Sequence, residues 1–219
     1  MAIEFDEFGP EKILEVYDPK TKMHGFTVIF NTALGPGKGG IRFTQTLDKE
    51  EVFRLARVMA WKCALAELPF GGAKSGIISP GKVTQEEKDK IIEAFAKAIK
   101  PICPSLYVAA PDIAMGEHEM EVFAKANGSM KSCTGKPSEL GGIPHELGST
   151  GIGVYYATLV AVKHKNLNIE NMRVAIEGFG NVGTFAAEYL AKDKAKIVAV
   201  SDSKGCIYDP NGIDIQELL

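Results

Sequence analysis

The sequence predicts an α/β protein in two parts, and three observations lead to this fold class. Short segments rich in β-branched and aromatic residues alternate with longer segments whose apolar residues recur at helical spacing. A glycine- and proline-rich stretch over residues 134–151 interrupts this alternation and is typical of a domain boundary. A strand, a helix and a second strand follow it, which together form a βαβ unit. We therefore expect one domain over residues 1–134 and another over residues 135–219.

Composition and charge exclude several classes of partner. The 219 residues are 45% hydrophobic and 24% charged, as in soluble globular proteins, and the net charge of −3 predicts no nucleic-acid or membrane partner. No apolar run reaches the length of a membrane-spanning helix, and the polar N-terminal segment is unlike a signal peptide. The four cysteines are widely spaced, so neither a metal site nor a disulfide framework is expected. A reducing cytoplasm is the predicted compartment.

The first part begins with two predicted strands, over residues 13–18 and 25–31, both rich in β-branched and aromatic side chains. The glycine-dense segment 35–42, "GPGKGGIR", is expected to be a loop that carries Lys38 and Arg42. The segment 48–68 has apolar residues at helical spacing. Asp48 is its predicted N-cap, and Glu51 three residues later would complete a capping box.

A second glycine-rich segment, "LPFGGAKSGI" at 68–77, is expected to be a turn around Lys74 that runs into a short apolar strand over residues 76–79. An amphipathic helix capped by Thr84 follows it. Residues 105–112 read as a buried strand that ends at Asp112, and residues 117–127 as a helix.

In the second part we expect a helix over residues 153–165, a strand over 173–179, a helix over 181–192 and a strand over 196–202. The segment "GFGNVG", residues 178–183, is a GxGxxG pattern that follows the first strand and opens a helix. Its glycines permit a tight turn and the close approach of a pyrophosphate to the helix N-terminus. The residues expected to bind a dinucleotide are Gly178, Gly180, Asn181, Val182 and Gly183.

An acidic residue at the end of the second strand supports this interpretation. Asp202 follows Gly183 by 19 residues, which is the spacing at which a carboxylate accepts the ribose hydroxyls of NAD. The same carboxylate would repel a 2′-phosphate, so the predicted cofactor is NAD, with NADP as the alternative. The simpler interpretation is a packed α/β turn that binds no nucleotide.

Three lysines and one aspartate form the second candidate site. Lys38, Lys62 and Lys74 lie in a loop–helix–loop arrangement that can bring them to one end of the sheet, and Asp112 closes another strand that could face them. Three cations and one carboxylate in one place would be a poor way to stabilise a fold. They would be suited to binding a dicarboxylate and tuning the basicity of an amine. The alternative is solvated charges that only look clustered in the sequence.

Several motifs in order resemble one family. They are "GPGKGGIRF", "MAWKCALAELPFGGAKSGI", "AAPD", "TGKP", "GFGNVG" and "VAVSDSKGCIYDPNGIDI". Together they are similar to the glutamate/leucine/phenylalanine/valine dehydrogenase superfamily, and most similar to its glutamate dehydrogenases. The resemblance implies a mixed-sheet substrate-binding and oligomerisation domain over residues 1–134. It also implies a linker helix and the first βαβ unit of a Rossmann NAD-binding domain over residues 135–219, and a homo-oligomer, either a hexamer or another assembly.

The resemblance also implies residue roles. Lys74 matches the catalytic lysine, and Asp112 matches its partner in proton transfer. Lys62 matches the lysine that binds the α-carboxylate of a small amino-acid substrate, and Thr150 matches the threonine near the nicotinamide. Lys38 matches the lysine that meets the side-chain carboxylate in family members acting on glutamate. The implied reaction is the reversible oxidative deamination of L-glutamate to 2-oxoglutarate and ammonia.

Two alternatives to a glutamate dehydrogenase stay open. The short N-terminal region before the first strands resembles the leucine and valine enzymes. Lys38, in contrast, resembles the lysine of the enzymes that act on glutamate. Family members also continue through more βα units, whereas this sequence contains only the first. We therefore expect a fragment, a chain completed by a partner, or a non-catalytic module that oligomerises or binds a ligand.

Overall fold

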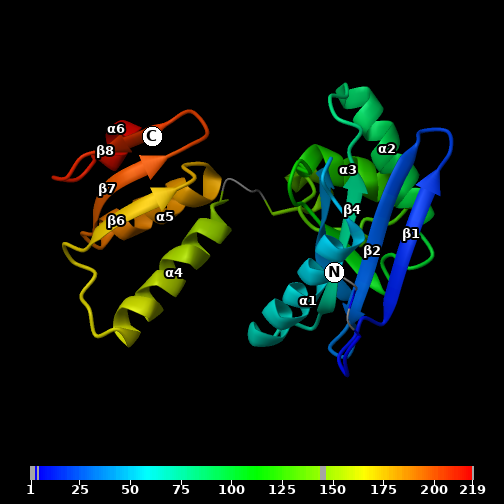
Figure 1. Cartoon of the computed structure of the whole chain (residues 1–219), viewed down its shortest axis with the longest axis horizontal. Coiled ribbons are helices and arrows are strands. Elements are labelled where there is room, and N and C mark those ends of the chain that lie inside the picture. Colours follow the sequence, from blue (N-terminus) through cyan, green and yellow to red (C-terminus); the bar gives the residue numbers. More distant parts are fainter. Residues whose placement is uncertain (1–2, 4, 144–146, 219) are drawn as a thin grey trace. The chain divides into compact units, whose positions relative to one another are not determined.

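The computed structural model describes residues 3, 5–143 and 147–218 of the chain. It divides into two compact units, Met1–Pro144 and His145–Leu219, so the division falls inside the glycine- and proline-rich segment 134–151. Figure 1 labels helices and strands of both units.

Unit 1 contains a five-stranded sheet and three long helices. In chain order its elements are β1 (Lys12–Asp18), β2 (Met23–Asn31), β3 (Gly37–Thr44), α1 (Lys49–Leu65), β4 (Gly71–Ile78), α2 (Gln85–Ala98), β5 (Tyr107–Ala110), α3 (Glu117–Asn127) and the 3₁₀ turn η1 (Ser138–Leu140). The strand order is β1-β2-β4-β3-β5. β2 is antiparallel to β1 and β4, while β3 is parallel to β4 and β5, so the sheet is mixed as expected.

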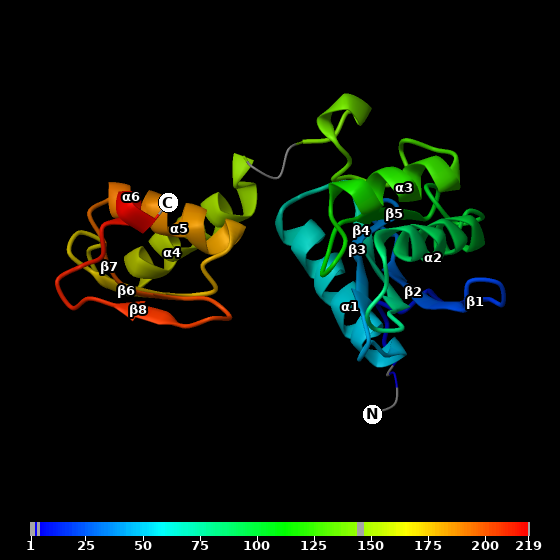
Figure 2. The ribbon, with the colours of Figure 1, turned by 90° about the horizontal axis from the view of Figure 1, so that it is seen from above.

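The helices cover both faces of this sheet, and Figure 2 shows α1 on one side and α2 with α3 on the other. Phe26, Val28 and Phe30 of β2 pack with Val52 and Phe53 on the α1 face. The opposite core is larger and buries apolar residues of the sheet under α2 and α3. Burial of apolar area on both faces is the main stabilising contribution to such a unit.

Two helices of unit 1 begin where the sequence predicts. The Asp48 side chain accepts a hydrogen bond from the backbone N–H of Glu51 at the start of α1. The Glu51 carboxylate turns to Arg42 and not back to Asp48, so only half of the expected capping box forms. Thr84 and Glu87 form both bonds of a capping box at the start of α2.

The prediction of glycine-rich loops around Lys38 and Lys74 is wrong, because both segments are strands. Lys38 is the second residue of β3 and Lys74 the fourth of β4. Glycine is disfavoured in strands unless another backbone approaches closely, and this is the case here. A Cβ on Gly72 would overlap the backbone of Ala60 in α1, so the glycine lets helix and sheet come together.

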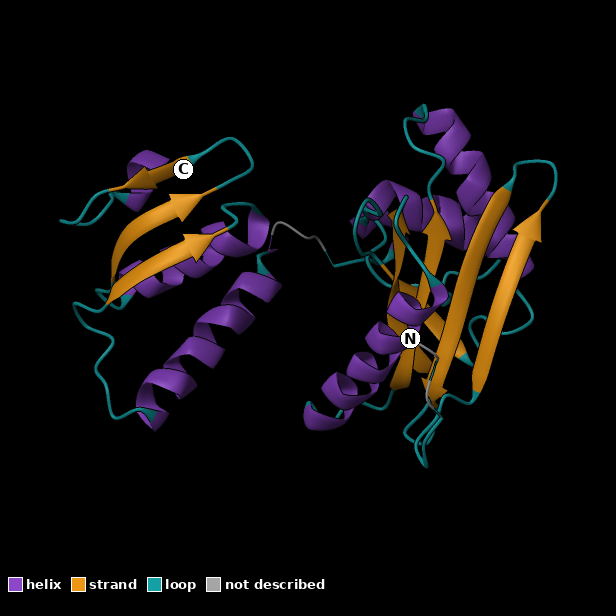
Figure 3. Ribbon diagram, viewed as in Figure 1, coloured by secondary structure: helices purple, strands orange, loops and turns teal. Residues whose placement is uncertain are grey.

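Unit 2 contains α4 (Ser149–His164), β6 (Arg173–Glu177), α5 (Asn181–Lys192), β7 (Lys196–Ser201), β8 (Cys206–Tyr208) and α6 (Ile215–Leu218). β6 and β7 are parallel and α5 connects them, which confirms the predicted βαβ unit. β8 adds an antiparallel strand that the sequence did not predict, since its three residues are all exposed and show no alternation. Figure 3 shows the three strands with α4 and α5 beside them.

Candidate active site

Lys74 and Asp112 form a close pair on the α1 face of the sheet in unit 1. Lys74 is opposite Val28 in the register of β4 with β2, and Val28 packs under α1. Lys74 Nζ is 2.8 Å from Asp112 Oδ2, and the two side chains are 8% and 18% exposed. The structure therefore brings together the two residues expected to carry out proton transfer, and it withdraws the lysine from solvent.

The space for this pair depends on Gly40 of β3. A Cβ there would lie 2.8 Å from Asp112 Cβ and 3.3 Å from Lys74 Nζ. A side chain of any size at this position would displace one partner. The glycine therefore serves the site, in addition to allowing close packing of the backbone.

Lys38 is on the same face of the neighbouring strand. It is paired in register with Gly72, two residues before Lys74. Its Nζ donates hydrogen bonds to Ala109 O at 2.6 Å and to Thr134 Oγ1 at 2.8 Å. Burial lowers the pKa of Lys38 to about 8, and the nearby ammonium of Lys136 acts in the same direction.

Lys136 is a buried cation whose role the sequence did not indicate beyond the "TGKP" motif. Its Nζ donates to the carbonyl oxygen of Cys133, a residue bridged to Ala109 beside the Lys38 contact. Among the described residues, neither Lys38 nor Lys136 is paired with a carboxylate, whereas buried Lys74 is. One buried and one half-buried ammonium group, with no carboxylate partner in the described part of the chain, favour the binding of an anion.

Lys62 behaves differently. It lies in the last turn of α1 and is exposed, and its side chain makes no hydrogen bond or ion pair with any residue that the structure describes. The expected gathering of three lysines is therefore seen for Lys38 and Lys74, which share a sheet face, while Lys62 extends from the helix that covers this face.

Arg42 was placed by the sequence in a loop without a role, yet it contacts the pair directly. Its Nε is 3.0 Å from Asp112 Oδ2, and its Nη1 is 2.5 Å from Glu51 Oε1. Burial works to raise the pKa of Asp112, but hydrogen bonds from Lys74 and Arg42 outweigh it and hold that pKa below its usual range. The period-two spacing of Lys38, Gly40 and Arg42 could have indicated that Arg42 lies on the same face as Lys38, because alternate residues of a strand share one face.

The glycine motif of unit 2 forms the turn between β6 and α5. Gly178 has φ +89, and a Cβ on Gly183 would overlap the Gly178 carbonyl, so both positions require glycine. Gly180 is the N-cap of α5, and a Cβ on Gly178 or Gly180 would meet nothing within 4 Å. Open space before a helix N-terminus fits a pyrophosphate, so the residues present fit the dinucleotide.

The other residues expected to bind the cofactor belong to the same unit. Asp202 follows β7 and is exposed; its Oδ1 accepts from the N–H groups of Lys204 and Gly205 at 2.7 and 3.0 Å. Thr150 is exposed in the first turn of α4. The next residue, Gly151, packs closely on α5, since a Cβ there would lie 2.7 Å from the carbonyl oxygen of Val182.

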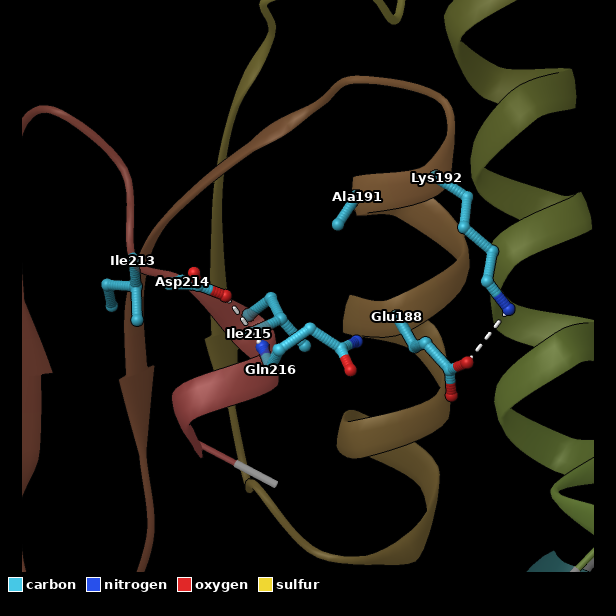
Figure 4. A pocket seen from close by; sticks show the side chains of 7 residues that line it. All are labelled: Glu188, Ala191, Lys192, Ile213, Asp214, Ile215 and Gln216. Carbon is cyan, nitrogen blue, oxygen red and sulfur yellow. Dashed lines mark hydrogen bonds and ion pairs between the residues drawn. The ribbon is translucent and has the colours of Figure 1, made fainter.

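A hollow of about 340 Å³ lies between α5 and α6 (Figure 4). It is lined by Glu188, Ala191, Lys192, Ile213, Asp214, Ile215 and Gln216. It adjoins the second half of α5, whereas the glycine motif leads into the first turn, so the hollow is separate from the expected nucleotide site. Within the described part of the chain, no helix is long and apolar enough to cross a membrane, and no cluster of side chains could hold a metal ion.

Comparison with known families agrees with this arrangement. Residues 10–128 match the Glu/Leu/Phe/Val dehydrogenase dimerisation domain, and residues 141–219 match the Glutamate/Leucine/Phenylalanine/Valine dehydrogenase domain. An NAD-specific glutamate dehydrogenase of Staphylococcus aureus (strain COL) is 39% identical over 204 residues, which cover 89% of this chain and 49% of that protein. A glutamate dehydrogenase of Aeropyrum pernix is 41% identical over 197 residues, covering 86% and 47%.

Solved structures show the same fold. The hetero-hexameric glutamate dehydrogenase of Thermus thermophilus superimposes with a TM-score of 0.85 at 27% identity, over 95% of this chain and 54% of that one. The glutamate dehydrogenase of Plasmodium falciparum also gives 0.85, at 30% identity, over 95% and 48%. The chain thus spans about half the length of these relatives. With both family domains matched in order, it belongs to the Glu/Leu/Phe/Val dehydrogenase family.

Proposed function

We propose that the protein formed by this chain, whole or completed, is an NAD-dependent glutamate dehydrogenase. The reaction would convert L-glutamate, NAD⁺ and water into 2-oxoglutarate, ammonium, NADH and a proton, and would run in both directions. The observation that carries the proposal is the pair of buried Lys74 with half-buried Asp112, beside Lys38, a half-buried cation without a carboxylate partner among the described residues. NAD⁺ would supply the hydride acceptor.

The chain's own residues would perform the remaining steps. Lys74 acts as the general base that takes a proton from water, so that the water attacks the iminium carbon left when hydride departs from Cα. Asp112 accepts hydrogen bonds from the substrate amino group and exchanges a proton with that group. Lys62 binds the α-carboxylate of the substrate. A base held out of solvent beside a fixed carboxylate is suited to such transfers.

Lys38 supports glutamate as the substrate. A side-chain carboxylate that is partly removed from water needs a cation, because an isolated buried charge is very costly. Lys38 offers this cation, and the neighbouring Lys136 adds positive potential. An apolar side chain of leucine or valine would leave both ammonium groups without an anion, which disfavours the branched-chain alternative.

We also propose a cytoplasmic homo-oligomer. The matched dimerisation domain supports self-association, as does an apolar groove of about 300 Å³ beside α1 that includes exposed Phe8, Leu34 and Trp61. Three free cysteines, Cys63, Cys103 and Cys133, are buried, as a reducing compartment permits.

The test is an assay of NAD reduction with glutamate, leucine and valine, on the 219-residue chain and on any longer natural form. Efficient turnover of glutamate supports the proposal. Turnover of leucine or valine in preference to glutamate would identify a branched-chain enzyme. Binding of NAD without turnover of any of the three would identify a non-catalytic module.

A further inference from the structure

Four charged side chains of alternating sign run from α1 across the sheet to the candidate base. They are Glu51, Arg42, Asp112 and Lys74, joined by contacts of 2.5, 3.0 and 2.8 Å. The side chains are 27%, 18%, 18% and 8% exposed in that order, so burial increases toward Lys74. The proposed reaction uses only the last two, which leaves the Arg42–Glu51 half unexplained.

This half is not needed to neutralise the pair. Lys74 and Asp112 already cancel one another, and a buried Arg–Glu pair is weak as a source of stability. A guanidinium does, however, offer several N–H donors in one rigid plane. Arg42 uses Nε for Asp112 and Nη1 for Glu51, so its plane is fixed at both ends.

The contacts of Asp112 distinguish its two oxygens. Both Lys74 Nζ and Arg42 Nε bind Oδ2. No hydrogen bond to Oδ1 is present among the described residues. The Asp112 side chain is 18% exposed. The backbone around Asp112 is also fixed, since its carbonyl accepts from Met115 N and the Ile113 carbonyl accepts from Phe43 N of β3, each at 3.0 Å.

With the backbone fixed, rotation of the carboxylate is the freedom that remains. Lys74 alone could follow either oxygen, because an ammonium on a four-carbon chain has no preferred plane. The rigid guanidinium of Arg42 cannot follow both oxygens in this way. It therefore selects Oδ2 as the oxygen bound within the protein and leaves Oδ1 for a ligand.

We propose that Arg42, anchored by Glu51, is a positioning residue that holds the Asp112 carboxylate in charge and orientation, with Oδ1 presented to the substrate amino group. This rests on the proposed function for the identity of the substrate. It adds a residue that touches neither substrate nor cofactor and that acts through Asp112.

The test follows the Asp112 carboxyl carbon by NMR in the 219-residue chain. In the unmodified chain it should titrate below the ordinary range of an aspartate. Arg42→Gln should raise the midpoint by about one pH unit or more, since a cation in contact shifts a carboxyl by that order. Arg42→Lys should restore most of the charge effect. Arg54→Gln is the matched control, because Arg54 is 56% exposed on α1 and its one ion pair among the described residues is with Glu50 of its own helix.

A second readout separates positioning from charge alone. Added glutamate should perturb the Asp112 carboxyl signal in the unmodified chain and in Arg54→Gln. The perturbation should be lost in Arg42→Gln and only partly recovered in Arg42→Lys, which supplies the charge without the planar fork. If Arg42 had only a structural role, both substitutions would lower thermal stability, and the glutamate response would not differ between Arg42→Gln and Arg42→Lys.

An unchanged midpoint in Arg42→Gln would overturn the proposal, and so would a glutamate response that persists in that variant. The absence of any glutamate response in the unmodified chain would overturn the presentation of Oδ1. Failure of the proposed function looks different, because turnover of glutamate would be missing in the assay while both NMR results could still be as expected.

Discussion

Lys74 of β4 and Asp112 beyond β5 are 38 positions apart in the sequence, and their side chains meet with Nζ 2.8 Å from Oδ2. β3 lies between the two strands, and its Gly40 is next to the place where the two side chains meet. A buried amine is thus held against a carboxylate that Arg42 also binds.

Replacement of Lys74 tests the role of the general base. Lys74→Ala should lower glutamate turnover at least about 100-fold in the active form, because loss of a general base typically has this effect. The fold should survive, since Arg42 still pairs with Asp112, and so should NAD binding, since the residues expected to bind the nucleotide belong to unit 2. Lys97→Ala, which removes an exposed lysine of α2, is the control. Activity above roughly a tenth of the original would show that Lys74 has another role.

Lys38 should set the choice of substrate. Lys38→Leu removes the half-buried cation and should reduce kcat/KM for glutamate by roughly thirty- to a thousand-fold, the effect of leaving a partly desolvated carboxylate unpaired. Discrimination against leucine should relax at the same time. The measurement is the ratio of kcat/KM values for glutamate and leucine in both forms. A ratio that does not move would mean that Lys38 does not meet the substrate.

Asp202 should set the choice of cofactor. The unmodified protein is expected to prefer NAD to NADP, because the carboxylate would repel a 2′-phosphate. Asp202→Asn keeps an Oδ1 acceptor for the N–H groups of Lys204 and Gly205 but removes the charge, so the NADP:NAD ratio of kcat/KM should rise. Asp209→Asn, in a similar turn, is the matched control. Equal efficiency with both cofactors before substitution would contradict the assignment.

Glu119 should make unit 1 sensitive to acid. Burial works to raise its pKa, but hydrogen bonds from Lys88, the Gly116 N–H and Gln85 outweigh it and lower the pKa to about 2. A carboxyl whose pKa falls on folding stabilises the native state above its unfolded-state pKa. This stabilisation is lost as the pH falls through the interval down to about 2.

Unfolding of unit 1 can be followed by the fluorescence of Trp61, the single tryptophan. Glu119→Gln should lower the unfolding free energy near neutral pH by about 2–3 kcal/mol and flatten its decline toward acid. Glu93→Gln, which alters a half-exposed pair within α2, should leave the acid dependence as it is. An equally steep decline in Glu119→Gln would show that other carboxyls cause the acid sensitivity.

Local patterns in the sequence were sufficient for the helices α1 to α5 and for the βαβ unit, but not for the short α6. Asp48 and Thr84 start helices because a side-chain oxygen there satisfies exposed N–H groups, which is a local interaction. The turn at Gly178 needs a positive φ, which glycine alone adopts freely. The order of motifs also indicated the family, which the matched domains confirm.

That the segments around Lys38 and Lys74 are strands could not be inferred from local sequence and is seen only in the folded chain. Their glycines look like loop residues until α1 lies against Gly72, because a close approach between backbones distant in sequence leaves no local signal. The same is true of Arg42 and Glu51, which meet only when β3 is covered by α1. The motifs indicated which residues could carry the chemistry, whereas long-range packing sets which of their atoms are in contact.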